Sequence, residues 1–236
     1  MLRSSALAPI GIVGDGRVAR HFVHYFGLLG VPARIWSRRA GAASPVDALA
    51  GCGRVLILIR DSAVIPFLEE WPALKAMGPV HFSGNLVTPL ARAAHPLMTF
   101  AERLYDLETY TSIPFVIDAG GPAFAELLPG LPNPSFTIDP AQRPYYHALC
   151  VLAGNGSTLL WAKLFDEFAN RLGLPPGAAH PFLKQVAANV ALNPARALTG
   201  PLSRGDDTTI RSNLAALEGD PFQGVYQAFV RAYAGR

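Results

Sequence analysis

The sequence of 236 residues has little of what marks several large classes of protein. Its two cysteines, Cys52 and Cys150, lie far apart and outside any C-x-x-C motif, so neither a disulfide framework nor a zinc site is expected. The apolar stretch at residues 1–9 is too short for a signal peptide, and no stretch reaches the ~18 uninterrupted apolar residues of a membrane span. We therefore expect a cytoplasmic protein with no membrane partner.

Charged residues are also scarce, at 16% of the chain, and 20 Lys and Arg against 17 Asp and Glu give a formal net charge of +3. The basic residues are scattered and form no dense block, so no nucleic-acid partner is expected. Hydrophobic residues make up 50% of the chain, which is typical of a globular protein and argues against disorder. The small positive excess would still attract an anionic cofactor.

Short apolar segments alternate with helical segments along the first part of the chain. Buried strands are expected at residues 9–13, 32–36, 54–59, 79–82, 115–118 and 135–138. Helices are expected between them at residues 18–29 and 65–74. Because strands that alternate with helices form βαβ units, the pattern predicts an α/β domain with a parallel sheet of the Rossmann type.

The character of the sequence changes after Asp139, where apolar helical stretches follow one another. These stretches cover residues 140–172, 179–192, 206–217 and 221–233. We therefore predict a Rossmann domain at 1–139, whose ligand the loops below indicate, and an all-helical C-terminal domain at 140–236. The helical part has more apolar surface than a free-standing unit would expose, so we expect it to form a homodimer with a second copy.

A glycine-rich loop follows the first expected strand and opens the first expected helix. Residues 14–19 read Gly-Asp-Gly-Arg-Val-Ala, which fits the dinucleotide-binding pattern G-x-G-x-x-A in its proper context. The first glycine makes the tight turn, the second lets the backbone approach a diphosphate, and the small third residue lets helix and strand pack closely. The helix N-terminus then offers N–H groups to the phosphates. The alternative is a glycine turn that binds nothing.

The end of the second expected strand discriminates between NAD and NADP. An NAD site normally has an acidic residue there, which binds the ribose hydroxyls, whereas this chain has Ser37, Arg38 and Arg39. Guanidinium groups form charge-assisted bonds to phosphate, so these residues favour NADP(H), unless the arginines are only solvated loop charges. The residues that we assign to the cofactor are Gly14, Asp15, Gly16, Arg17, Val18, Ala19, Ser37, Arg38, Arg39 and Asp61.

Polar residues also follow the later strands. In an open α/β sheet the ligand lies beyond the carboxyl ends of the strands, where we place His81, Ser83 and a loop at 94–100 that contains His95. A histidine in that position could give a proton to a carbonyl or imine as hydride arrives. Each histidine could equally be a hydrogen-bonded structural residue.

The helical part carries two polar segments. Asn155 lies between two glycines, and because glycine inside a helix costs about 1 kcal/mol, the pair indicates close approach of a ligand or of another helix. The turn-rich segment 199–206 contains Arg204, which could bind a substrate carboxylate or be a surface charge. Asp206 could cap the next helix.

No signature of a metal site or of a nucleophilic enzyme is present. The sequence contains no H-x-x-x-H with an acid, no G-x-S-x-G and no Walker loop. His21 and His24 lie one turn apart on the first helix, at the flanks of its apolar face, so we expect them to be exposed to solvent rather than to bind a metal.

Taken together, the order of these motifs resembles a known family. The segments that carry the resemblance are residues 14–16, 37–39, 81–84 (His-Phe-Ser-Gly), 95–100 (His-Pro-Leu-Met-Thr-Phe), 146–147 with Asn155, and 199–206 (Thr-Gly-Pro-Leu-Ser-Arg-Gly-Asp). Over nearly its whole length the chain is similar to bacterial Rossmann-like proteins that are assigned as NADP oxidoreductases and carry a C-terminal helical domain of unknown function. More distantly, it resembles pyrroline-carboxylate reductases and the 6-phosphogluconate dehydrogenase-like group.

The resemblance implies a Rossmann domain, a helical domain and a homodimer built through the helices, but it implies no particular substrate. It also implies cleft residues, of which we assign a catalytic role to His81, Ser83, His95 and Asn155. The substrate-binding residues that it implies are His147, Thr199, Arg204 and Asp206. The hydroxyacid dehydrogenases among the distant relatives use a helix lysine and an asparagine as a set. We do not assign this role to Lys163, because it lies about 80° around the helix from Asn155.

The residues and the resemblance favour an NADP(H)-dependent oxidoreductase that acts on a small carbonyl or imine compound. The alternative is a non-catalytic regulatory protein that binds NADP(H). A flavin or deazaflavin partner also stays open.

Overall fold

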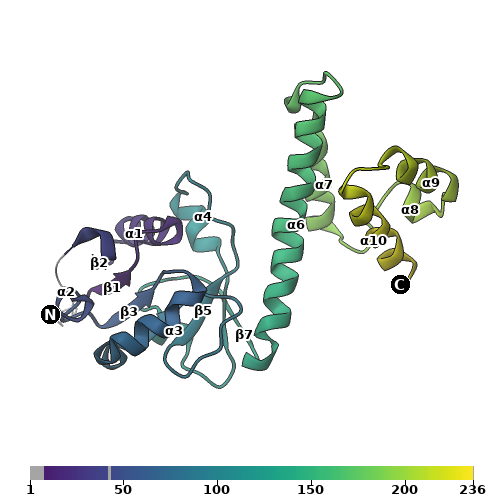
Figure 1. Ribbon diagram of the computed structural model, residues 1–236. Helices are drawn as coiled ribbons and strands as arrows, with labels where there is room; N and C mark the ends of the chain where they lie inside the picture. The colour runs from purple at the N-terminus through teal and green to yellow at the C-terminus, as the bar shows by residue number, and fades with distance from the viewer. Residues whose placement is uncertain (1–7, 42–43, 236) are drawn as a thin grey trace. The chain divides into compact units, whose positions relative to one another are not determined.

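The computed structural model describes residues 8–41 and 44–235, which form two compact units that divide after Thr158 (Figure 1). The first unit contains a seven-stranded sheet with the order β2-β1-β3-β4-β5-β6-β7. Strands β1 to β5 run parallel, β6 is antiparallel to β5, and β7 is parallel to β6. The strands are β1 (Ile10–Val13), β2 (Ala33–Trp36), β3 (Arg54–Ile57), β4 (Pro79–His81), β5 (Arg92–Pro96), β6 (Phe115–Asp118) and β7 (Ser135–Ile138).

All six expected strands are confirmed, and the unit is a Rossmann-type α/β domain. The fifth strand was not expected, because residues 94–100 have the composition of a loop. Pairing with β6 makes the first part of that segment a strand, in which His95 lies opposite Val116. His95 therefore belongs to the sheet and not to a loop.

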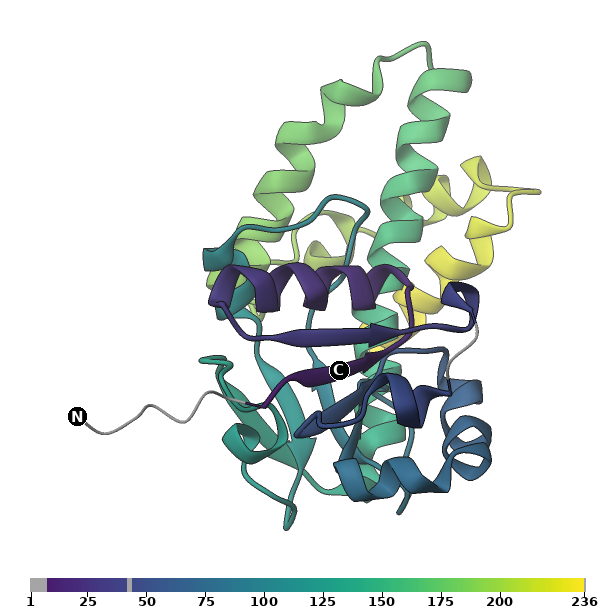
Figure 2. The ribbon, with the colours of Figure 1, turned by 90° about the vertical axis from the view of Figure 1, so that its left-hand side faces the viewer.

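Helices cover both faces of the sheet (Figure 2). Helix α1 (Arg17–Leu29) lies on one face and ends at Gly30, whose φ of 67° is the left-handed conformation of the expected helix stop. Helices α2 (Pro45–Ala48) and α3 (Asp61–Glu70), with the 3-10 helix η2 (Pro72–Met77), lie on the other face. The expected helix at 65–74 therefore starts one turn earlier and stops before Pro72. The short helix α4 (Leu107–Ser112) follows β5, and the short helix α5 (Phe124–Leu127) follows β6.

One flank of α1 is covered, contrary to expectation. His21, expected to be exposed, has 1% of its surface accessible, because the rings of Phe100, Tyr105 and Tyr110 surround it at centroid distances of 4.7–5.8 Å. Its Nε2 donates to the carbonyl oxygen of Ala101 at 2.8 Å, and its Nδ1 accepts from the Tyr110 hydroxyl at 2.8 Å. The loop after β5 is thereby held against α1.

The second half of the chain is helical, as expected. A short 3-10 helix η3 (Pro140–Gln142) precedes α6, and the following elements are α6 (Arg143–Asn170), η4 (Pro176–Ala179), α7 (His180–Leu192), α8 (Pro201–Arg204), α9 (Asp207–Ala216) and α10 (Phe222–Ala234). The last strand ends at Ile138, next to the boundary predicted at Asp139. The compact units divide further along, within α6, so the first half of α6 belongs with the sheet.

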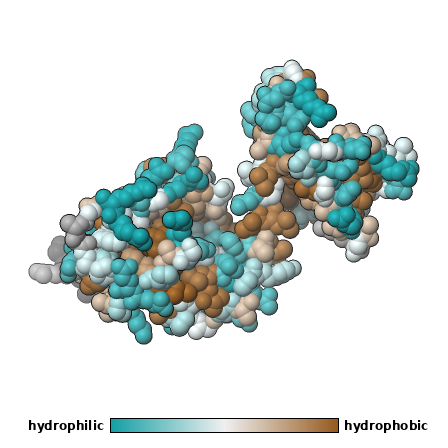
Figure 3. All heavy atoms as spheres, in the orientation of Figure 1, coloured by the Kyte–Doolittle hydropathy of each residue, from teal (hydrophilic) through white to brown (hydrophobic). Residues whose placement is uncertain are grey.

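Helix α6 is apolar on all sides. Apart from Arg143 its residues are exposed or half-buried, and Figure 3 shows apolar side chains at the surface around it. By length and composition alone, residues 140–170 could cross a membrane, with a mean hydropathy of 1.3 over the best window. A helix that packs inside a soluble protein passes the same test, so this composition by itself does not overturn the expectation of no membrane partner.

Candidate functional site

A cavity of about 660 Å³ opens at the carboxyl ends of β1 to β5. This is the edge at which open α/β sheets bind their ligands. The cavity is lined by most of the residues that the sequence assigned to the cofactor and by two of the proposed catalytic residues. These are Gly14, Asp15, Gly16, Arg17, Val18, Ser37, Arg38, Arg39, Asp61, Ser83 and His95.

The two glycines of the loop have different physical roles. Gly14 has a φ of 121°, and a Cβ atom there would collide with the carbonyl oxygen of Leu58, so the fold itself requires glycine. Gly16 has an ordinary φ of −70°, and a Cβ there would meet no atom of the described residues within 4 Å. The fold therefore does not require glycine at position 16. Its bare backbone leaves room for a ligand in the cavity.

The N-terminus of α1 has the features of an anion-binding site. Gly16 is the N-cap residue, no side chain of the described residues caps the helix, and its first turn contains no acidic residue. The first N–H groups of a helix have no intrahelical partner and carry a partial positive charge. Ala19 is buried directly behind this turn, which lets the helix pack closely on the sheet. These features fit a diphosphate.

The arginines after β2 lie on the same cavity. Ser37 is buried, while Arg38 and Arg39 begin the 3-10 helix η1 (Arg38–Ala40) and are exposed. A hydroxyl and two guanidinium groups at the end of β2 fit a 2′-phosphate, as the sequence predicted.

Ser83 has no free hydrogen-bonding capacity for chemistry. Its hydroxyl donates to Asp61 Oδ2 at 2.5 Å and accepts from the backbone N–H groups of Asn85 and Leu86 at 3.2 and 3.0 Å. These bonds tie the turn after β4 to the first residue of α3. The hydroxyl is thus placed to position Asp61 in the cavity wall.

The two strand-end histidines differ in their access to the cavity. His81 is only 1% exposed and does not line the cavity, whereas His95 does. Burial is the main cause that lowers the pKa of each to about 4. The charge of Arg143 adds to the effect at His81, while His147 and then Arg143 add to it at His95. Both rings are therefore uncharged at neutral pH, and His95 is the one that can meet a ligand.

His95 has a partner that the sequence analysis did not assign. The hydroxyl of Tyr146, on the first turn of α6, lies 2.7 Å from His95 Nδ1. Burial, with a smaller contribution from the hydrogen bond to Cys150, raises the pKa of Tyr146, so its hydroxyl keeps its proton at neutral pH. This hydroxyl can donate to Nδ1 or accept from it, depending on the tautomer of His95. Tyr146 stands next to His147 in one of the motifs quoted above, but nothing in the sequence shows which of the two faces the sheet.

Gly84 allows α6 to approach this close. A Cβ at Gly84 would lie 2.5 Å from His147 Cδ2 and 3.1 Å from His95 Nε2. Real Cβ atoms do not come as close as the first distance, and the second is a tight contact, so His147 packs directly on the Gly84 backbone. The ring centroids of His95 and His147, both assigned to the cleft by the resemblance, are 5.9 Å apart.

A buried ion pair fixes the start of α6. The side chain of Arg143 is 0% exposed and donates from Nε to Asp118 Oδ1 at 2.5 Å and from Nη2 to the carbonyl oxygen of Val116 at 3.3 Å. Tyr146 and His147 follow three and four residues later and so share its helix face. The pair therefore sets the register that brings Tyr146 to His95.

The remaining predicted residues belong to the middle of α6 and to the second unit. Asn155 is exposed on α6, and Thr199 and Arg204 are exposed in the second unit. Asp206 caps α9, since its Oδ1 accepts from the Thr209 N–H at 3.0 Å and its Oδ2 from the Thr209 hydroxyl at 2.7 Å. Capping therefore accounts for Asp206, and the substrate roles of these residues stay predictions.

Lys163 is engaged within the second unit. Its Nζ lies 2.7 Å from Glu167 Oε1 and 2.6 Å from Asp220 Oδ2. These two ion pairs account for the lysine, so no catalytic role is assigned to it.

A comparison with models of protein families identifies the family of this chain. A model described as a domain of unknown function, DUF2520, matches residues 113–233, slightly more than half of the chain. The chain belongs to the DUF2520 family. The match begins just before β6, so the DUF2520 region takes in β6, β7 and the helical part. A search of curated sequences finds no match to this DUF2520 protein.

Solved structures share the fold of this DUF2520 protein over almost its full length. A candidate NADP oxidoreductase from Bacteroides fragilis has a TM-score of 0.77 at 22% identity, with 98% of this chain and 99% of that chain covered. A Streptomyces aurantiacus imine reductase has a TM-score of 0.64 at 16% identity, covering 96% and 93%. An Aspergillus terreus reductive aminase, solved with NADPH, has a TM-score of 0.59 at 16% identity, covering 96% and 94%. At these identities the likeness shows the fold, that of the Rossmann-type NADP oxidoreductases.

Proposed function

We propose that this protein is an NADP(H)-dependent oxidoreductase that reduces a small carbonyl or imine compound. The observation that carries the proposal is the uncapped N-terminus of α1, with the bare backbone of Gly16, in the wall of a cavity that also holds Arg38 and Arg39. A diphosphate and a 2′-phosphate complement these two positive regions. The names of the structural relatives, which include NADPH and imine reduction, support the choice of cofactor and of reaction class.

NADPH, when bound, supplies a hydride, and the protein must position the substrate and move a proton. We assign to His95 the tautomer in which Nδ1 accepts from the Tyr146 hydroxyl and the ring proton lies on Nε2, beside Gly84. We assign to this N–H the transfer of a proton to the carbonyl oxygen or imine nitrogen. The Tyr146 proton moves onto Nδ1 in the same step, so no charged imidazole forms. Nδ1 then returns this proton to Tyr146 as Nε2 takes a proton from solvent, which restores the starting state. Protons delivered by a positioned side chain contribute about 10²–10⁴-fold in rate.

Calorimetric titration with NADPH and with NADH tests the cofactor assignment. We expect NADPH to bind about tenfold more tightly or better, which corresponds to the ~1.4 kcal/mol of one charge-assisted hydrogen bond. Arg38→Ala and Arg39→Ala should each reduce the difference in affinity between NADPH and NADH. Arg92→Ala removes the same charge from an exposed position at the start of β5 and should not narrow it. Equal affinities would contradict the NADP assignment, and no binding of either nucleotide would contradict the whole proposal.

Oxidation of NADPH across a panel of keto acids and cyclic imines tests the reaction. His95→Gln and Tyr146→Phe should lower turnover by about 10²-fold or more while NADPH still binds. Unchanged turnover after His81→Ala and His95→Ala together would refute the assigned proton transfer. Tight NADPH binding with no turnover on any compound would favour the regulatory alternative.

We further propose that the protein is a cytoplasmic homodimer joined through its C-terminal helices. Exposed large apolar side chains along α6 support this, and they include Leu149, Val151, Leu152 and Leu159. Burying such surface is the main favourable contribution to association. Light scattering should give twice the chain mass, and Leu152→Glu should shift the protein toward the monomer. A wild-type monomer at high concentration would contradict the proposal.

A further inference from the structure

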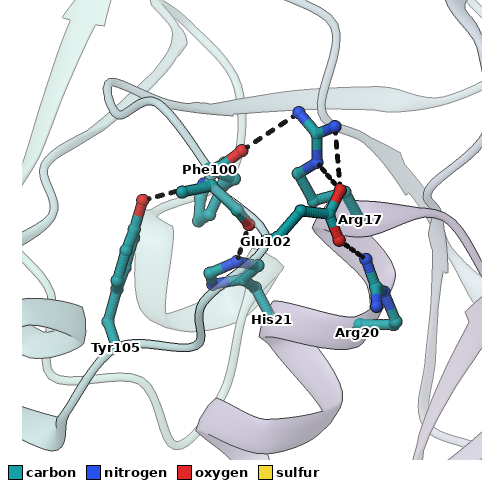
Figure 4. Close-up of polar contacts among 7 residues, drawn as sticks. Arg17, Arg20, His21, Phe100, Glu102 and Tyr105 are labelled. Atoms are coloured by element: carbon teal, nitrogen blue, oxygen red, sulfur yellow. Dashed lines mark hydrogen bonds and ion pairs between the residues drawn. The ribbon is translucent and has the colours of Figure 1, made fainter.

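A single carboxylate joins the start of α1 to the loop after β5 (Figure 4). Glu102 Oε1 accepts from Nε of Arg17 at 3.0 Å and lies 3.0 Å from Arg17 Nη2 in an ion pair, and its Oε2 accepts from Nη2 of Arg20 at 2.6 Å. The two arginines lie on α1, more than eighty residues away in the chain. Neither the cofactor assignment nor the proton transfer gives Glu102 a role.

The loop that carries Glu102 is held independently of these ion pairs. The buried ring of His21 donates to the carbonyl oxygen of Ala101 at 2.8 Å. The Tyr105 hydroxyl accepts from the Ala101 N–H at 3.0 Å and donates to the carbonyl oxygen of Thr99 at 2.6 Å. The backbone directly before Glu102 is therefore fixed on the side of α1, and the carboxylate is presented to the arginines from an ordered support.

Arg17 keeps free donors in the cavity wall. Its side chain lines the cavity at the first position of α1 and makes three contacts with the loop, two to Glu102 and one from Nη1 to the carbonyl oxygen of Phe100 at 3.4 Å. A guanidinium group has five N–H donors. Among the residues that the structure describes, at least one N–H on each terminal nitrogen is left without a partner, and such a pair matches two oxygens of a phosphate group.

We infer that Glu102 is a positioning residue of the cofactor site, which holds the Arg17 guanidinium in the cavity wall so that its two remaining N–H groups can bind the diphosphate. The inference rests on the proposed function, in which NADP(H) binds at residues 14–19. An arginine that is already ordered loses less side-chain entropy when it binds an anion. Arg20 neutralises the second oxygen of Glu102, so the triad keeps a net positive charge of one toward an incoming anion.

The sheet order predicts which half of the cofactor depends on Glu102. Arg38 and Arg39 follow β2, on one side of β1, whereas the loop with Glu102 follows β5, on the other side. The 2′-phosphate and adenosine therefore lie on the side of β1 away from this loop. Glu102 should affect binding of the whole dinucleotide and not of its adenosine fragment.

Calorimetric titration of the full chain tests the inference, with NADPH and adenosine 2′-monophosphate as probes, the second of which lacks the diphosphate. Glu102→Gln should raise the Kd for NADPH about tenfold and leave that of the fragment within about twofold. Glu108→Gln, which removes a carboxylate from an exposed position on α4, is the matched control and should leave both unchanged. In an Arg17→Gln background Glu102→Gln should have no further effect. The thermal midpoint should stay the same in all variants, because exposed ion pairs add little stability.

Each contrary result has a definite meaning. No NADPH binding by the wild-type protein overturns both the proposed function and this inference. Wild-type binding with equal or tighter binding by Glu102→Gln overturns only the inference. A further loss of affinity in the Arg17→Gln background, or an equal loss for the adenosine fragment, also overturns it, since Glu102 would then act by another route.

Discussion

Replacing Gly16 with alanine should abolish cofactor binding and leave the fold intact, whereas the same change at Gly14 should destabilise the fold. At Gly14 the φ of 121° costs an L-residue roughly 1–3 kcal/mol. The overlap with the Leu58 carbonyl adds a similar amount, as overpacking does. Leu58 cannot move freely, because its N–H donates to the carbonyl oxygen of Val13 at 2.8 Å. The sum, about 2–6 kcal/mol, is a large part of the ~5–15 kcal/mol that holds a typical domain together.

At Gly16 the contributions to stability nearly cancel. The backbone angles of −70° and −178° suit alanine, and no atom of the described residues lies within 4 Å of the added methyl group. Alanine lowers the entropy of the unfolded chain, which stabilises by about 0.4–1 kcal/mol, and it is a poorer N-cap than glycine by a similar amount. The free energy of unfolding should therefore change by less than about 1 kcal/mol, while the methyl group occupies the space that the diphosphate needs.

Urea denaturation and NADPH titration of the two variants test this reasoning together. Gly27→Ala, inside α1 and away from the cavity, is the control and should leave NADPH binding unchanged while adding about 0.5–1 kcal/mol of stability. Wild-type NADPH affinity in Gly16→Ala would refute the diphosphate site. Wild-type stability in Gly14→Ala would refute the backbone argument.

Three further results are expected. Because the pKa of His81 and of His95 is about 4 in the folded protein against 6.5 when unfolded, the unfolded chain binds more protons between these values, and unfolding should become easier as pH falls from 7 to 5. The loss is roughly 1–2 kcal/mol per histidine by urea denaturation, and a His81→Asn variant with the same pH dependence would contradict it. Gly84→Ala should push the start of α6 off the sheet and cost about 1–3 kcal/mol, so an unchanged unfolding midpoint would be contrary evidence. Arg143→Met leaves the Asp118 carboxylate unpaired and should lower the free energy of unfolding by about 3–5 kcal/mol. Adding Asp118→Asn to this variant should restore part of the loss, and no recovery would contradict the described role of the ion pair.

The sequence by itself determined the elements whose signal is local. Strands β1 to β4 are short apolar runs between turns, and α1 begins at a glycine motif and ends at Gly30, so each can be recognised within about fifteen residues. The cofactor residues at 14–19 and 37–39 follow from the same local logic, because parallel strands bring their carboxyl ends to one edge. Most of these residues line the cavity at that edge, and their role in binding a cofactor stays a prediction.

Only the tertiary structure decided how the later segments pair and which polar residues work together. β5 is a strand because β6 pairs with it, and no pattern within residues 92–96 shows this. His21 is buried because a loop about eighty residues away covers it, and His95 meets the cavity while His81 does not. The contacts of His95 with Tyr146 and of Glu102 with Arg17 join residues 51 and 85 positions apart. Contacts at such separations depend on how helices and strands pack, and packing leaves no periodic trace in the sequence around either partner.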